Sequence, residues 1–293
     1  MTDRSTPLEE VVRRGPRLLG PRRPPGSREE GARSALIAFV STLILVGLAL
    51  WFILTSEAWP RVQKQFFNPS AFREVWPDVV SGFWLDIKMF LVAEVVILTL
   101  ALIVAMIRSL RGPAFLPIRV LAIFYIDLVR GIPVILLILL LGFGVPALQL
   151  SGVPDGRLFW GVTALVISYT AYTSEVYRAG IDSVHESQRM SAQSLGLTQG
   201  KTLWYVIVPQ AVRNVIPALL NGFVSLQKDV ALVSLIGPVE ILRQAGIDKA
   251  TYANFTPYVA ASLIFLAITI PCTRLADWLL ARQRARTGAT TIA

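Results

Sequence analysis

The sequence predicts an all-α integral membrane protein that crosses the bilayer six times. The chain has 293 residues, 54% of them hydrophobic, and a mean hydropathy of +0.59. A helix needs about 20 mainly apolar residues to cross the hydrocarbon core of a bilayer. The six runs that reach or approach this length lie at residues 35–55, 82–107, 121–147, 158–177, 206–236 and 257–280.

The distribution of Lys and Arg predicts a multi-pass membrane protein with both termini in the cytoplasm. Outside the interiors of the spans, 18 cations lie on the side of the termini and 6 lie on the other side. Cytoplasmic loops of membrane proteins carry the excess of Lys and Arg. The net charge of +9 would also suit nucleic-acid binding, but the charges follow the topology. We therefore expect no nucleic-acid partner.

The two ends of the chain differ in composition from the spans. Residues 1–34 hold eight Arg together with Pro and Gly and lack apolar periodicity, which predicts a disordered basic cytoplasmic tail. This tail either contacts anionic membrane lipid or only fixes the topology. Residues 35–55 form an N-terminal transmembrane helix, which starts too far into the chain for a cleaved signal peptide. Residues 286–293 form a second cytoplasmic tail.

The sequence contains no pattern typical of an enzyme or a metal site. A single cysteine, Cys272, excludes an intramolecular disulfide, and a single histidine, His185, excludes a multi-histidine metal site. The chain has neither H-E-x-x-H nor G-x-S-x-G. The run GLTQGKT at residues 196–202 is one residue short of the phosphate-binding loop G-x-x-x-x-G-K-[ST]. We expect no catalytic residue, metal or cofactor in this chain.

The polar segment between the fourth and fifth apolar runs predicts a rigid two-helix knob that another protein can bind. Ser183 and Glu186 match a capping box that starts a short helix. Gly196 can end this helix in a left-handed turn. Thr198 can cap a second helix that ends before Pro209. A featureless loop is the alternative, but the spacing and the flanking membrane runs agree with the knob.

The spacing within this segment resembles the docking loop of ABC-importer permeases, whose pattern is roughly E-A-A-x3-G-x9-I-x-L-P. Met190 stands where the family has Glu, so an ionic contact with the motor subunit is missing, and Glu186, one turn earlier, is the candidate substitute. The loop spans residues 178–209. The resemblance assigns ATPase docking to Ser183, Glu186, Met190, Ser191, Ala192, Gly196 and Pro209.

Four further patches carry the resemblance to the polar-amino-acid subfamily of these permeases over residues 80–285. Leu85–Lys88 resembles "TLKL", and Asp127–Pro133 resembles "ELFRGTP". Ala171–Ile181 resembles "AYTSEIxRGGI", and Ser225–Gly237 resembles "SLLKDTSLVSVIG". The family core has five helices, so the resemblance implies that the helix at 35–55 is an N-terminal addition.

Two departures from the family patches affect the expected substrate path. Val230 and Ala231 replace the Thr-Ser of "KDTS", which removes two hydroxyl groups close to where the resemblance places the substrate. Ile132 replaces the Thr of "RGTP".

The resemblance implies a permease subunit of an ATP-driven importer for polar amino acids such as histidine, arginine, glutamine and glutamate. ATP and Mg would bind to separate ATPase subunits. The other implied partners are a second permease subunit, identical or homologous, and an extracytoplasmic solute-binding protein. Closure of the ATPase dimer would move the docking loops and switch the cavity from inward-facing to outward-facing.

Ionisable side chains inside membrane spans often mark substrate paths or internal pairs, because burying a charge in lipid is costly. Lys228 and Asp229 present both signs that a zwitterion needs, at a helix interruption that the resemblance implies. The alternative is a pair that only stabilises this interruption. Ser234 in the same patch is a further candidate on the path.

Three other sites with charges in the spans have open roles. Asp127 and Arg130 are three residues apart and can pair, which suits a gate or helix packing better than substrate contact. Glu175, three residues after Tyr172, either links the docking loop to the cavity or pairs structurally. Glu94 is either a cavity anion for a cationic substrate or a protonated carboxyl bonded to a neighbouring helix.

Two other classes of membrane protein remain as alternatives. A six-helix secondary transporter or channel would also bury charges, but it has no motor subunit and no use for a docking loop. An intramembrane enzyme would need a catalytic motif that the sequence lacks. Co-purification with a P-loop ATPase discriminates the permease from both.

Overall fold

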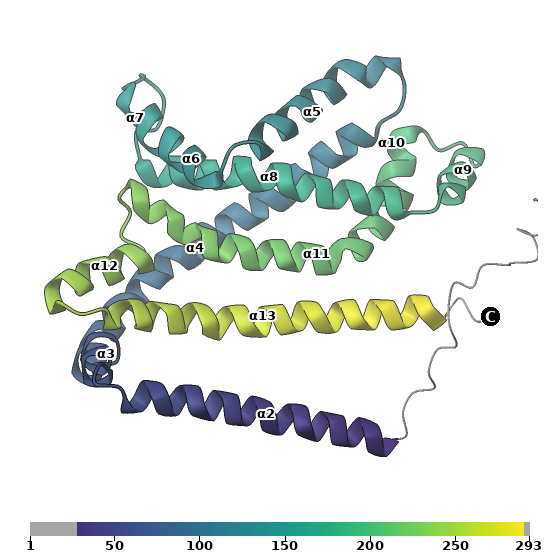
Figure 1. The fold of residues 1–293 in the computed structure, drawn as a ribbon. Coiled ribbons are helices and arrows are strands. Elements are labelled where there is room, and N and C mark those ends of the chain that lie inside the picture. The colour runs from purple at the N-terminus through teal and green to yellow at the C-terminus, as the bar shows by residue number, and fades with distance from the viewer. Residues whose placement is uncertain (1–27, 290–293) are drawn as a thin grey trace, which may run out of the picture. The chain divides into compact units, whose positions relative to one another are not determined.

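The computed structural model describes residues 28–289, with side chains for residue 34 and residues 36–282. The chain divides into two compact units after Arg61. The first contains helix α2 (Arg28–Thr55), and helix α3 (Trp59–Phe66) leads into the second. All regular elements of the described part are helices (Figure 1).

Helix α2 begins at Arg28 and not at residue 35, so the predicted disorder of residues 1–34 is wrong for residues 28–34. Residues 1–27 lie outside the described part of the chain. No charged residue occurs from Leu36 to Thr55, and this stretch is long and apolar enough to span a membrane.

Helix α4 (Pro69–Ser109) starts well before the predicted span at 82–107. Asn68 caps it by accepting hydrogen bonds from the N–H groups of Ser70 and Ala71 at 3.1 and 3.3 Å, and Pro69 suits the first turn. Its 41 residues extend about 60 Å at 1.5 Å per residue, twice the bilayer core. The helix therefore continues beyond the apolar segment.

The third predicted span, 121–147, is not one helix. Helix α5 (Leu116–Arg130) is followed by α6 (Val134–Leu139), the π-helix η2 (Leu140–Gly144) and α7 (Val145–Ala147). The two halves meet at 98°. Pro133 has no N–H to continue the α5 ladder, and Gly131 caps its last turn. Before α5, Gly112 has φ +114 and leads into the short helix η1 (Pro113–Phe115).

Helix α8 (Arg157–Ser183) lies at the centre of the second unit and packs against α4, α5, α6 and α11. Small residues allow this close packing. A Cβ on Gly180 would lie 2.9 Å from the carbonyl oxygen of Ala211, and a Cβ on Gly161 would lie 2.7 Å from Val233. Leu165 of α8 is fully buried in the apolar core that surrounds this helix.

The last part of the chain forms two long helical segments. Helix α9 (Glu186–Ser194) is followed by an unbroken segment of α10 (Gln199–Thr202), π-helix η3 (Leu203–Ile207), α11 (Val208–Asp229) and 3-10 helix η4 (Val230–Ile236). Helix α12 (Ile241–Tyr252) connects to α13 (Thr256–Ala289). Helix α13 includes the first half of the predicted tail 286–293, and residues 290–293 lie outside the described part.

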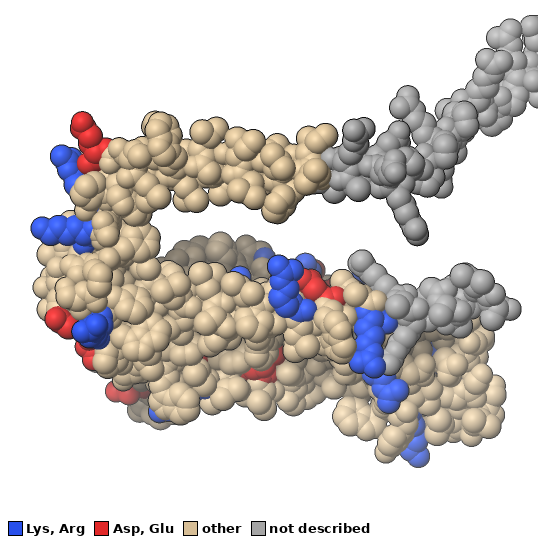
Figure 2. Space-filling model, turned by 90° about the horizontal axis from the view of Figure 1, so that it is seen from below, with Lys and Arg blue, Asp and Glu red and all other residues tan. Residues whose placement is uncertain are grey.

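Within the second unit, α9 and α10 lie at one end and α7 and α12 at the opposite end (Figure 1). On the face drawn in Figure 2, Lys and Arg side chains of this unit gather mainly toward its two ends, with mostly uncharged surface between them. Four described helical segments are long and apolar enough to cross a membrane, and there are five if the bent pair is one span. Helix α8 is not among them, so the number six stays a prediction.

Candidate functional site

The predicted knob is present as α9 and α10, but its first cap is wrong. His185 caps α9, and its Nδ1 accepts a hydrogen bond from the Ser187 N–H at 3.2 Å. Ser183 is still the last residue of α8. Its hydroxyl donates to the Gly180 carbonyl at 2.7 Å and accepts from Asn214 at 3.0 Å. Because α8 runs this far, Ser183 cannot take the extended conformation of an N-cap.

The left-handed turn at Gly196 is confirmed, with φ +83. The Gly196 N–H donates to the Gln193 carbonyl at 2.9 Å, and the Leu197 N–H donates to the Ala192 carbonyl at 3.2 Å. These two bonds satisfy carbonyl groups at the end of α9, as in a Schellman motif. The Ala192 side chain is buried, which fixes the inner face of α9.

Thr198 caps α10, since its hydroxyl accepts from the Lys201 N–H at 3.5 Å. The sequence predicted that the second helix ends before Pro209, and this prediction is wrong. The helix widens into the π-helix η3 and continues as α11. Pro209 follows directly after this wide turn, and its missing N–H removes one bond of the ladder there.

Arg111, in the connection after α4, holds both helices of the knob. Its guanidinium donates to Oε1 of Glu186 at 3.0 Å, and its backbone N–H donates to Oε1 of Gln199 at 3.2 Å. Glu186 also pairs with Arg189 at 3.4 Å. The carboxylate that was expected to replace the family Glu is therefore already engaged within the chain. At the position of that Glu, the Met190 side chain is 57% exposed.

Glu175 belongs to an ion network at the end of α8 nearest the knob. It pairs with Arg108 from α4, and Oε2 accepts from Arg178 at 2.9 Å. Arg178 also binds Asp182 at 2.7 Å. Tyr172 is not a partner of Glu175, because its hydroxyl lies 3.4 Å from the Arg130 carbonyl oxygen. The network ties α4 to α8 beside the knob.

A cavity of ≈ 450 Å³ lies between α6, α8 and α11, and several polar side chains, including Lys228 and Asp229, are on its otherwise largely apolar wall. Asp229 accepts a 2.7 Å hydrogen bond from the Tyr169 hydroxyl. Lys228 is exposed and has no hydrogen bond or ion pair among the described residues. The other polar lining side chains are Tyr172, Thr173 and Ser225.

The expected helix interruption is a change of helix type. Helix α11 ends at Asp229, and η4 continues it as a 3-10 helix without a break in the chain. Val230 and Ala231 are buried against the core and do not line the cavity, contrary to expectation. Ser234 is also buried, and its hydroxyl donates to the Ala231 carbonyl at 2.7 Å. Its side of η4 borders a different cavity, of ≈ 600 Å³, beside α12.

The proposed pair of Asp127 and Arg130 is not formed among the described residues. The Arg130 guanidinium instead lies over the Tyr172 ring, 5.6 Å from its centroid, a favourable cation–π geometry. Glu94 is half-buried on α4 and has no hydrogen bond or ion pair in the described part of the chain.

Sequence reasoning missed a pair of buried carboxyl groups, Asp86 on α4 and Glu240 before α12. Glu240 caps α12 by accepting from the N–H groups of Leu242 at 2.9 Å and Arg243 at 2.7 Å. Asp86 Oδ2 accepts from the Ile241 N–H at 3.2 Å, and its Oδ1 has no donor. The two carboxyl groups are close enough to interact electrostatically. Burial raises the pKa of Glu240.

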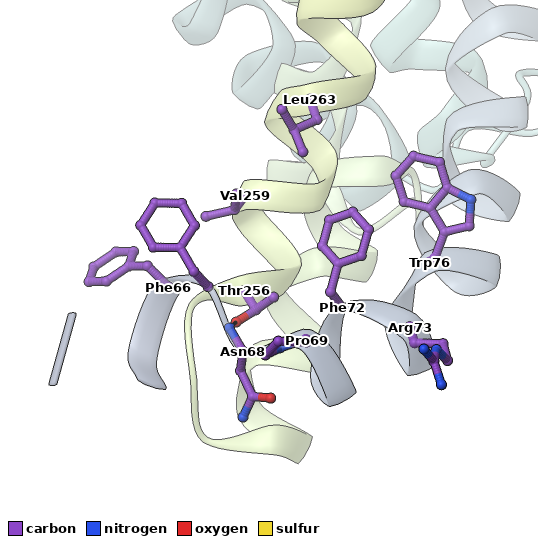
Figure 3. Close-up of a pocket in the computed structure, with 10 residues that line it drawn as sticks. Phe66, Asn68, Pro69, Phe72, Arg73, Trp76, Thr256, Val259 and Leu263 are labelled. Carbon is purple, nitrogen blue, oxygen red and sulfur yellow. Dashed lines mark hydrogen bonds between the residues drawn. The ribbon is translucent and has the colours of Figure 1, made fainter. Parts of the chain in front are cut away.

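A larger cavity, of ≈ 630 Å³, lies at the start of α4 and α13, far along both helices from the knob. Figure 3 shows that Phe66, Phe72, Val259 and Leu263 surround it, with Arg73 and Trp76 nearby. The lining is almost wholly apolar, which is typical of a surface in contact with lipid tails. It offers no paired charges for a polar ligand.

The membrane helices and the two-helix knob define the class of this protein as a membrane-embedded permease. The chain belongs to the family of binding-protein-dependent transport system inner membrane components, whose profile matches residues 98–285. It is a permease subunit of an ABC transporter and has no catalytic activity of its own. Its fold implies ATPase subunits as partners.

Several named proteins are similar to this chain. It is 31% identical over 195 residues to the arginine transport system permease protein ArtQ of Bacillus subtilis, which covers 66% of this chain and 87% of that protein. It is 37% identical over 151 residues to the arginine ABC transporter permease protein ArtQ of Haemophilus influenzae, over 50% of this chain and 68% of that protein.

Solved structures agree with the assignment. A crystal structure of an amino acid ABC transporter with histidines has a TM-score of 0.61 and 33% identity, and covers 70% of this chain and 94% of that one. An inward-facing MetNI methionine ABC transporter has a TM-score of 0.58 at 14% identity over 70% of this chain and 95% of that one. The second similarity concerns the fold alone.

Proposed function

We propose that this chain forms the translocation path of an importer for polar amino acids, with the cavity between α8 and α11 as part of that path. The observation that carries the proposal is the wall of this cavity, where Lys228 and Asp229 place a cation and an anion side by side. Similar permeases named for arginine and glutamine support the substrate class.

The chemistry of the cavity suits a zwitterion. The Lys228 ammonium has no partner among the described residues, so it can bind an α-carboxylate, while Asp229 can bind an α-ammonium. The Tyr169 hydroxyl holds one oxygen of Asp229 and leaves the other available. Glu94 and Glu175 are weaker candidates for the path, since neither lines this cavity and Glu175 is paired with two arginines.

The remaining partners follow from the transporter class. The knob would dock on an ATPase subunit that carries ATP and Mg, and the chain itself would need no cofactor. A second permease subunit, identical or homologous, and an extracytoplasmic solute-binding protein would complete the transporter. We place the knob and both termini in the cytoplasm, because the excess of cations lies on that side. ATPase closure would then move the knob and switch the cavity.

Uptake by the reconstituted transporter tests this proposal. Proteoliposomes containing the permease, the ATPase and the binding protein should take up one or more polar amino acids only with ATP. Asp229→Asn should reduce uptake strongly while co-purification with the ATPase persists, because the ligand ammonium loses its counter-charge. Asp155→Asn, the same change in an exposed connection outside the cavity, is the control.

Two outcomes would count against the proposal. Uptake without any ATPase would indicate a secondary transporter or channel. If Asp229→Asn only destabilises the permease, and the double change Lys228→Met with Asp229→Leu restores expression and transport, the two residues are a structural pair.

A further inference from the structure

Leu195, at the tip of the knob, is the most exposed large apolar side chain in the described part of the chain, at 84%. Most other exposed apolar side chains belong to the long helices, where lipid can cover them. Leu195 instead lies in a polar segment with exposed neighbours such as Gln193 and Ser194. An apolar side chain in such a polar surface is a typical anchor for a protein partner.

The exposure of Leu195 is built into the backbone. Its N–H donates to the Ser191 carbonyl at 3.2 Å, so the residue is held at the end of α9. The left-handed Gly196 then reverses the chain, and the buried Ala192 fixes the opposite side of the helix. The turn therefore presents the Leu195 side chain outward in one defined position.

The charges around Leu195 favour an apolar partner surface. Residues 184–207 contain three charged side chains, Glu186, Arg189 and Lys201. Glu186 is neutralised by Arg111 and Arg189. Lys201 is exposed and has no ion pair in the described part of the chain. Within α9, the turn and α10 (residues 186–202), the knob thus offers two exposed large apolar side chains, Met190 and Leu195, and one available cation, but no available anion, while the exposed Trp204 and Tyr205 follow in η3.

We infer that the knob binds its ATPase through Met190 and Leu195, which enter an apolar groove with an acidic rim that faces Lys201. This inference rests on the proposed docking function and specifies its chemistry. In this mode of binding, neither residue 190 nor Glu186 forms an ion pair with the ATPase. Burial of both side chains would supply the attraction, and Lys201 would orient the partner.

Binding of the full-length permease to its ATPase in lipid nanodiscs tests the inference. Leu195→Ala should weaken binding about tenfold or more, since it removes most of an exposed apolar anchor. Because Leu195 makes few internal contacts, the melting temperature of the permease alone should not change. Gln193→Ala, on the same helix and also exposed, is the matched control and should bind normally.

Met190→Glu provides the decisive comparison, because it restores the residue that the family loop carries at this position. An apolar groove should reject the new carboxylate, and binding should weaken. Tighter binding by Met190→Glu, or normal binding by Leu195→Ala, would overturn the inference while leaving docking intact. No ATPase binding by the unaltered chain would overturn the proposed function itself.

Discussion

The Tyr169 hydroxyl on α8 donates a 2.7 Å hydrogen bond to Oδ2 of Asp229, the last residue of α11. The bond joins two central helices of the permease at the point where the α-helix changes to a 3-10 helix. Asp229 is held from α8, and in the described part of the chain it forms no ion pair with Lys228. The Lys228 ammonium therefore remains available to a ligand.

Replacing Tyr169 with Phe tests the importance of this bond. The change keeps the ring but removes the donor, and a hydrogen bond to a charged group contributes about 1.5–3 kcal/mol. We expect KM for uptake to rise by about tenfold or more, with normal assembly. Tyr205→Phe is a suitable control, because Tyr205 is 68% exposed and does not line the cavity. Equal KM values for the two variants would contradict a role for the bond in binding.

A side chain at position 196 should destabilise the turn because of the backbone conformation there, and not because of a steric clash. A Cβ on Gly196 or on Gly200 would meet no atom within 4 Å, but only Gly196 has a positive φ, +83. Gly196→Ala should cost the knob about 1–2 kcal/mol, and Gly196→Val more. Transport should then uncouple from ATP hydrolysis while membrane insertion persists.

Gly200→Ala provides the control for the turn, because it introduces the same methyl group into a helix. It should be neutral or slightly stabilising. The ratio of amino acid taken up to ATP hydrolysed is the measurement. Normal coupling in Gly196→Val would remove the basis for assigning this segment to docking.

The carboxyl pair of Asp86 and Glu240 predicts a pH-dependent stability. Burial raises the pKa of Glu240 above its ordinary value of 4.5, so the folded state binds a proton more tightly than the unfolded state. The contribution of Glu240 to the free energy of unfolding should therefore be largest below pH 4.5, its ordinary pKa. This contribution should fall as the pH rises through the higher pKa of the folded state. Melting temperatures in detergent across this range measure the effect.

Asp86→Asn should flatten this dependence. The Asn amide can donate to Glu240 without an added proton, while its oxygen still accepts from the Ile241 N–H. Asp155→Asn in an exposed connection should leave the slope unchanged. A native slope that persists in Asp86→Asn would show that other groups cause it.

Cysteine labelling tests the orientation in the membrane. In a Cys272→Ala background, cysteines at Ser70 and Gly156 should react with an impermeant reagent added outside intact cells. A cysteine at Thr198 in the knob should react only after the cells are opened. The prediction follows from the excess of 18 cations over 6 on the proposed cytoplasmic side. The reverse labelling pattern would exclude the orientation.

Local signals in the sequence were sufficient to predict helix ends at positions where one residue controls the backbone. Gly196 and Thr198 end and start the helices of the knob as predicted, because turn and cap preferences depend on a few neighbouring residues. Hydropathy was less informative about helix length. Residues 69–81 of α4 are helical but not uniformly apolar, so a search for apolar runs does not detect them.

The partners of side chains in the packed structure were not predictable from the spacing of residues along the sequence. Asp127 and Arg130 are three residues apart and could have paired, but Arg130 lies over Tyr172 instead. The run 121–147 is apolar on average, although Gly131 and Pro133 interrupt it, so hydropathy alone predicts one span and does not reveal the 98° bend. Tyr169 could have been noticed, since it lies three residues before Tyr172 on the same helical face. Its partner Asp229 depends on the packing of α8 against α11.

The unbroken helical segment from Gln199 to Ile236 gives the knob a mechanical connection to the cavity. A continuous helix has no loop that could absorb a displacement, so it acts as a lever. One close contact of this segment joins Gly180 and Ala211, where the absence of a Cβ lets the two helices approach. The arm from Ala211 to Asp229 is longer than the arm from Gln199 to Ala211. If the helix turns about Ala211, a small tilt imposed on the knob would give a larger displacement at Lys228 and Asp229.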